Sequence, residues 1–189
     1  MQERHLKRPD HIFSKNHHMK KAVLLVLVVL SGLSSVYSQA NYHDAVGIRV
    51  GTGYYDLFSA DYKHFFGESH HAIELNFGFK PNYSAYDIFN LSLSATYQYH
   101  IETQVPGLQW FLGGGLLAYN SFAGNHDSRG FGVAAYPTAG VDFKFRGIPL
   151  DVSGDLRPTF RVHQPNDGQY NAINFGTIGF SVRYVLDSY

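Results

Sequence analysis

The stretch that decides the fold covers residues 90–101 and reads Asn90-Leu91-Ser92-Leu93-Ser94-Ala95-Thr96-Tyr97-Gln98-Tyr99-His100-Ile101. Apolar and polar side chains alternate through it with a period of two, which is typical of a β-strand with two different faces. Strands in globular sheets usually have about five or six residues, whereas a tilted strand needs roughly nine to eleven to cross a bilayer. The length and the alternation together indicate a strand that spans a membrane.

The same alternation recurs along the chain between clusters of Gly, Asn, Pro and Asp, and no long stretch has the 3.6-residue period of a helix. It predicts eight strands, at residues 45–54, 57–66, 71–80, 90–101, 108–120, 131–145, 148–162 and 174–186. We therefore expect an all-β protein, an eight-stranded antiparallel transmembrane barrel.

Side-chain size predicts which face of each strand points outward. One face carries large apolar residues such as Ile48, Phe77, Leu93 and Phe180, and the other carries Gly, Ser, Thr and a few charged residues. The bore of an eight-stranded barrel is just wide enough for side chains to fill it. We expect the apolar face, with its bulky aromatic rings, to contact lipid and the small polar face to line the interior.

The interior face contains equal numbers of basic and acidic residues, and paired charges are tolerable in a confined space where unpaired ones are not. The predicted interior charge network consists of Arg49, Asp61, Lys63, Glu74, Asp142, Lys144, Asp151, Asp155, Arg157 and Arg183. For Arg183, on the last strand, the expected partner is Asp151 or Asp155 on the strand before it.

The connections between the predicted strands alternate in length. Those at 67–70, 102–107 and 146–147 are tight, whereas 81–89, 121–130 and 163–173 are longer; only 53–56 breaks the pattern. Outer-membrane barrels have short periplasmic turns, longer external loops and aromatic girdles at both interfaces. We expect such a girdle at the tight-turn end, formed by Phe65, Phe66, Tyr97, Tyr99, Trp110, Phe143, Phe145 and Tyr184.

The N-terminus has the pattern of a secretory signal peptide at residues 19–38. Lys20 and Lys21 precede an apolar run at 22–30, which is far shorter than the roughly 20 residues of a spanning helix. Small residues before Gln39 favour cleavage there. We interpret 1–18 as an over-extended start or a leader and 39–189 as the barrel, which keeps only nine Lys and Arg.

This combination of leader, eight amphipathic strands and a last strand at 179–186 resembles the small outer-membrane β-barrel family of Gram-negative bacteria, to which the OmpA membrane domain and OmpX belong. The resemblance covers the whole mature chain and implies a multi-pass outer-membrane protein, exported through its signal peptide and inserted by the outer-membrane assembly machinery. That machinery reads a terminal aromatic residue in such proteins. Here Tyr189 is out of phase with Tyr184, a departure from the family pattern.

Motifs for chemistry are few, and we expect no catalytic, cofactor-binding or metal-binding residues. The chain has no Cys, and Gly113-Gly114-Gly115 lacks the Lys and Ser or Thr of a phosphate-binding loop. His70-His71 has no third metal ligand at a suitable spacing. Balanced charge gives no basic footprint for nucleic acid.

Two alternatives stay open at this point. One is an enzyme similar to the barrels that modify lipid A, with His126, Asp127, Ser128 and His163 as candidates at the outer rim. The other is a soluble lipocalin-like carrier, which would need its large apolar residues inside.

The favoured hypothesis is a monomeric barrel with a structural or surface-interaction role. Its partners would be the lipid around it and an unknown extracellular ligand at the long loops. The preferred contact residues are Tyr83, Tyr86 and Phe89.

Overall fold

The computed structural model describes residues 42–53, 55–67, 69–81, 88–123, 130–163, 173–175 and 177–186. These residues form ten β-strands: β1 (Asp44–Gly51), β2 (Phe58–Phe65), β3 (His71–Lys80), β4 (Ile88–Glu102), β5 (Leu108–Ala123), β6 (Gly130–Lys144), β7 (Leu150–Leu156), β8 (Thr159–His163), β9 (Ile173–Asn174) and β10 (Ile178–Val185). No helix among them is long and apolar enough to cross a membrane. The predicted signal peptide lies outside the described residues.

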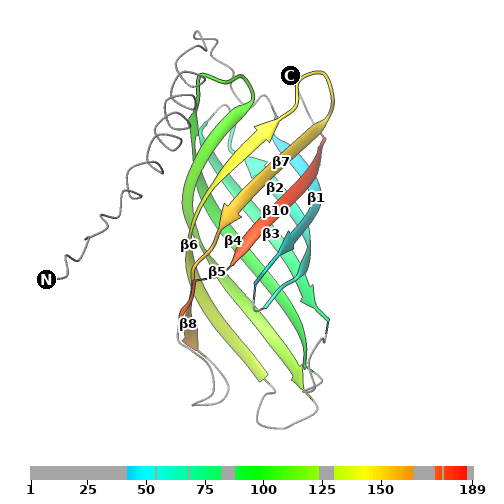
Figure 1. Ribbon diagram of the computed structural model, residues 1–189, viewed down its shortest axis with the longest axis vertical. Helices are drawn as coiled ribbons and strands as arrows, with labels where there is room; N and C mark the ends of the chain where they lie inside the picture. Colours follow the sequence, from blue (N-terminus) through cyan, green and yellow to red (C-terminus); the bar gives the residue numbers. More distant parts are fainter. Residues whose placement is uncertain are drawn as a thin grey trace, which may run out of the picture. The chain divides into compact units, whose positions relative to one another are not determined.

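The strands close into one antiparallel barrel (Figure 1). Each strand from β1 to β6 pairs with the next, β6 pairs with both β7 and β8, and β10 joins β7 to β1. β7 and β8 occupy the same position in the barrel wall, one after the other, and so do β9 and β10. The ten strands therefore occupy eight positions around the barrel, and we call each position a stave. The prediction of an all-β, eight-stranded antiparallel barrel is confirmed.

The predicted strand 148–162 is interrupted, since β7 ends at Leu156 and β8 begins at Thr159. Pro158 lies in the gap and has no backbone N–H to donate to a neighbouring strand. The predicted strand 174–186 is also divided, into β9 and β10.

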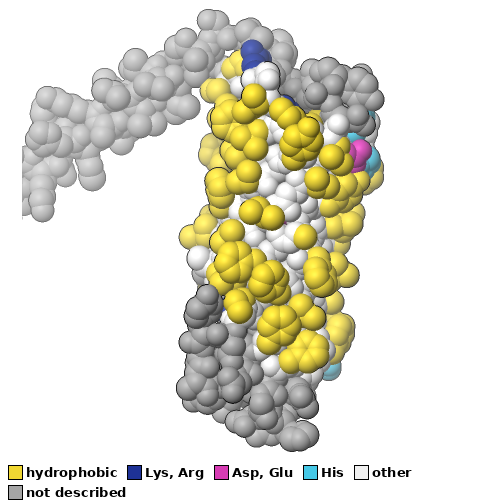
Figure 2. Space-filling view, turned by 90° about the vertical axis from the view of Figure 1, so that its right-hand side faces the viewer, with side chains coloured by type: hydrophobic (Ala, Val, Ile, Leu, Met, Phe, Trp, Pro, Cys, Tyr) yellow, Lys and Arg dark blue, Asp and Glu magenta, His cyan; other side chains and the backbone are white. Residues whose placement is uncertain are grey.

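The two faces of each strand are oriented as predicted. Leu93 is 58 % exposed on the outside of β4, whereas its polar neighbours along the strand, including Gln98, are buried in the bore. Figure 2 shows apolar side chains over most of the visible wall. A soluble carrier with an apolar interior is therefore excluded, and the outer surface is suited to lipid.

Bulky aromatic rings nevertheless enter the bore, against expectation. Phe65, predicted in the outer girdle, is only 2 % exposed and points inward, and Phe111 and Tyr119 on β5 are also buried. The physical reason is glycine on the neighbouring strand: Phe111 pairs with Gly140 and Tyr119 with Gly132, and a Cβ at either glycine would collide with the ring. Gly on the adjacent strand provides the room that the ring needs.

Candidate functional site

The interior has three layers along the barrel axis. At the tight-turn end, an aromatic and aliphatic cluster consists of Tyr42, Ala45, Phe65, Ala72 and Val185. At the loop end, a second cluster consists of Tyr55, Leu117, Tyr119, Ala134 and Tyr136. The charged network lies between these two apolar layers.

Arg49 and Asp155 form the centre of the network on its loop side. The Arg49 guanidinium donates from Nε and Nη2 to the two carboxylate oxygens of Asp155, at 3.0 and 2.8 Å. Its Nη1 lies 3.3 Å from Asp56 Oδ2. Arg49 and Asp155 are fully buried, so this bidentate contact satisfies both ions inside the barrel.

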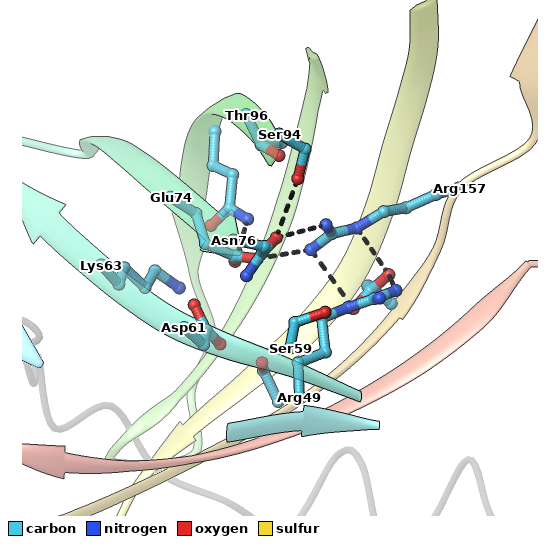
Figure 3. A network of polar contacts seen from close by, with 12 residues as sticks. Arg49, Ser59, Asp61, Lys63, Glu74, Asn76, Ser94, Thr96 and Arg157 are labelled. Atoms are coloured by element: carbon cyan, nitrogen blue, oxygen red, sulfur yellow. Dashed lines mark hydrogen bonds and ion pairs between the residues drawn. The ribbon is translucent and has the colours of Figure 1, made fainter. Parts of the chain in front are cut away.

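Arg157 crosses the bore from the stave of β7 to the side of β3 (Figure 3). Its Nη1 donates to Asn76 Oδ1 at 2.8 Å, its Nη2 donates to Glu74 Oε1, and its Nε lies 2.8 Å from Asp155 Oδ1. The guanidinium also lies over the Tyr136 ring, 5.6 Å from its centre. Arg157 thus holds together opposite walls of the barrel.

Arg183 performs the same role on the turn side. Its three nitrogens meet three carboxylates: Nε lies 2.8 Å from Asp61 Oδ2, Nη2 donates to Glu74 Oε2 at 3.0 Å, and Nη1 donates to Asp151 Oδ2 at 2.9 Å. The predicted contact with Asp151 is present. The alternative partner, Asp155, instead pairs with Arg49 and Arg157.

Lys63 completes the network near the turn end. It is fully buried, donates to Asp142 Oδ2 and lies 5.2 Å from the centres of the Phe65 and Phe111 rings. Two aromatic faces therefore supplement a single carboxylate around this ammonium group.

Lys144, predicted as part of this network, does not join it. Its Nζ donates to the carbonyl oxygens of Phe145 and Ile148, both at 2.9 Å. Lys144 is the register partner of Asp151, but the carbonyl oxygens of the tight turn between β6 and β7 bind its ammonium group instead of that carboxylate.

The prediction listed only charged residues of the strands and so omitted further members of the network, among them Asp56, Asn76, Gln98 and His100. Gln98 donates to Glu74 Oε2 at 2.7 Å, and His100 Nε2 lies 3.2 Å from Gln98 Oε1. The period-two alternation places Asn76, Gln98 and His100 on the inward face, so the sequence could have identified them as interior residues. Asp56 lies in a connection between strands, where periodicity says nothing.

A small cavity lies between the network and the loop-end cluster. Its lining includes Arg49, Asp56, Ser94, Tyr136, Arg157 and Thr159. It has room for about one or two water molecules, by the usual volume of a buried water. Charged and aromatic side chains surround it.

The predicted loop residues have different outcomes. Tyr83 and Tyr86 lie outside the described residues, as do the rim candidates His126, Asp127 and Ser128. Phe89 lies on the outer face of β4, with its ring 6.1 Å from that of Phe122 on β5. His163 is the exposed last residue of β8.

No protein-family model and no curated protein sequence matches the chain. Among solved structures, the N-terminal β-barrel domain of Pseudomonas aeruginosa OprF is similar, with a TM-score of 0.55, 19 % identity, and 76 % of this chain and 98 % of that one covered. Neisserial surface protein A (NspA) matches with a TM-score of 0.49 and 17 % identity over 76 % of this chain and 94 % of its own. The closed ring of eight staves and the similarity to OprF lead to one conclusion: the chain has the fold of the small eight-stranded outer-membrane β-barrels.

Proposed function

We propose that this protein is an outer-membrane barrel that serves as a rigid scaffold and presents its long loops at the cell surface for structural or binding contacts. One observation carries the proposal. The outer wall is apolar while the bore is filled by paired charges and aromatic rings, so the barrel is suited to lipid outside and offers no wide passage inside. A scaffold of this kind leaves the loops as the place for recognition.

The membrane location is tested by fractionation. Cells that express the full chain are broken, and the outer membranes are separated from the soluble fraction and washed with carbonate. We expect the protein in the washed outer membranes, with slower migration on a gel after boiling, because closure pairs every strand edge and makes the barrel resistant to detergent. Recovery in the soluble fraction would contradict the proposal.

The orientation is tested by two tagged variants. One carries a short epitope within 124–129 and the other carries it inserted after Gly147, in the tight turn between β6 and β7, which keeps this glycine at its positive φ of 80°. Antibody should reach the first epitope on intact cells and the second only after the cells are opened. The reverse result would place the tight turns outside.

A further inference from the structure

The buried network is short of positive charge. Among the described residues, its fully buried bases are Arg49, Lys63, Arg157 and Arg183, and its fully buried acids are Asp61, Glu74, Asp142, Asp151 and Asp155. Asp56, a sixth acid, lies toward the loop-end cavity with 13 % of its side chain exposed. Four bases face five acids in a space closed by apolar layers, where an uncompensated charge is costly.

Two of the five acids have enough donors to stay ionised. Glu74 accepts hydrogen bonds from Arg157, Arg183 and Gln98. Asp155 accepts two from Arg49 and also contacts Arg157 Nε. These groups are unsuitable for holding the missing positive charge.

The other three acids accept fewer hydrogen bonds. Asp61 has a charged nitrogen to itself, Arg183 Nε at 2.8 Å from its Oδ2. Asp142 and Asp151 point into the bore from neighbouring strands, since Asp142 pairs with Ser153, two residues along β7 from Asp151. The same nitrogen, Arg183 Nη1, lies 2.9 Å from Asp151 Oδ2 and 3.7 Å from Asp142 Oδ1, and it also donates to Ser153 Oγ. Oδ1 of Asp142 and Oδ1 of Asp151 have no hydrogen-bond donor among the described residues.

The groups that face this pair from the other strands add to its electrostatic environment. They are Asp61 and Lys63 on β2, Glu74 on β3, His100 on β4, Arg183 on β10 and the buried Tyr42 hydroxyl before β1. Lys144 on β6 is opposite Asp151, but its ammonium group binds the carbonyl oxygens of the tight turn. His100 is buried, its Nδ1 has no hydrogen-bond partner, and it lies 3.8 Å from Asp142 Oδ2. A metal cation would lie against the Arg183 guanidinium and the Lys63 ammonium, which would repel it, whereas a proton needs no additional space.

We propose that Asp142 and Asp151 form a proton-binding site: the Asp151 carboxyl carries a proton at neutral pH and donates it to Asp142, whose other oxygen accepts from Lys63. Two adjacent carboxylates that share too few donors favour holding one proton between them. The bound proton balances the four buried bases against four remaining buried carboxylates. Folding of this barrel therefore takes up a proton that Asp151 in an unfolded chain releases at neutral pH.

Infrared spectroscopy of the barrel folded in detergent micelles at pH 7 tests the assignment. We expect the carbonyl stretch of a protonated carboxyl, shifted in deuterated water, to be present in the wild type, lost in Asp151→Asn and retained in Asp155→Asn, the control on the same face of β7. A wild-type spectrum without the band would overturn the proposal. So would a band that survives in Asp151→Asn, and its loss in Asp61→Asn alone would assign the proton to that residue.

Proton uptake also predicts that the stability of the barrel depends on pH, which can be measured without infrared spectroscopy. The folding equilibrium constant of the wild type, relative to Asp151→Asn, should fall roughly tenfold for each unit that the pH rises above about 5, for as long as the site stays protonated. Comparison with the variant cancels the titration of the histidines. Parallel pH profiles would refute proton uptake at Asp151; if Asp151→Asn does not fold, the wild-type band alone decides.

Discussion

At the scale of single residues, the interior is held together by guanidinium groups that each contact several carboxylates. Arg183 contacts Asp61, Glu74 and Asp151, and Arg157 connects Glu74 to Asp155. Because Glu74 accepts from both arginines, the two halves of the network form one unit. The removal of one ion therefore leaves several others uncompensated.

The pair Arg183 and Asp61 allows this to be measured. Arg183→Ala should lower the free energy of unfolding by about 3–5 kcal/mol, since it leaves buried carboxylates without their positive partner. Asp61→Asn removes one of them, so the double variant should be less destabilised than the sum of the single ones, by about 0.5–3 kcal/mol. The measurement is urea unfolding in lipid vesicles. Additive effects would mean that the Nε contact with Asp61 carries no coupling.

A second residue-scale prediction concerns Gly179, which leaves room for Arg49. A Cβ at this position would overlap the Arg49 guanidinium, whereas a Cβ at Gly154 would meet nothing closer than 4.0 Å. Gly179→Ala should displace Arg49 from Asp155 and cost about 1–3 kcal/mol, as expected for buried groups that lose their partners. Gly154→Ala is the control and should be neutral or slightly stabilising. Equal unfolding midpoints for the two variants would contradict this account.

At the scale of elements, each strand has one face toward lipid and the other toward a charged bore. The longest staves, β4, β5 and β6, have 15 or 16 residues, whereas β1, β2 and β10 have eight. The outward side chains of β4 therefore lie at different depths of the apolar layer, from its centre to the interface.

Depth along β4 predicts the cost of a charge on the lipid face. Leu93 lies near the middle of the strand and Ile101 near its turn end, and both are exposed on the outer wall. Leu93→Arg should destabilise the barrel by about 2–4 kcal/mol and Ile101→Arg by about 0–1 kcal/mol. Unfolding in lipid vesicles gives both values. If Leu93→Arg has no effect, β4 does not face lipid at this position.

At the scale of the whole molecule, the barrel and its long loops should be separable. The interior contacts described above join the strands and the short connection between β1 and β2, so the scaffold does not depend on the tips of the three long loops. This is the physical basis for placing a binding role at the loops and a structural role in the wall.

Replacement of residues 82–87, 124–129 and 164–172 by short Gly/Ser turns tests the separation. We expect the variant to keep its boiling-dependent gel shift and to lose any adhesion or surface binding of the wild type. A variant that keeps full binding would direct attention to the wall and the cavity beside Arg49. One that no longer folds would show that the loops help to hold the barrel.

The sequence by itself determined the class of fold and the face on which each residue lies. A period of two assigns every side chain of a strand to one of two sides, and the large apolar residues cannot all fit in a narrow bore. For this reason nine of the ten predicted interior charges lie in the network. The same alternation assigns Asn76, Gln98 and His100 to the inward face.

Only the tertiary structure decided which of these groups meet. The partners of Arg49 and Arg157 come from strands distant in sequence, and the height at which a residue enters the bore depends on strand register, which periodicity does not contain. Register sets Phe111 and Tyr119 opposite glycines that admit them to the bore. The tight turn after β6 brings two carbonyl oxygens to Lys144, which therefore stays out of the network although it is opposite Asp151. The alternation of a strand encodes its two sides, but contacts across a closed barrel depend on how all eight staves are aligned.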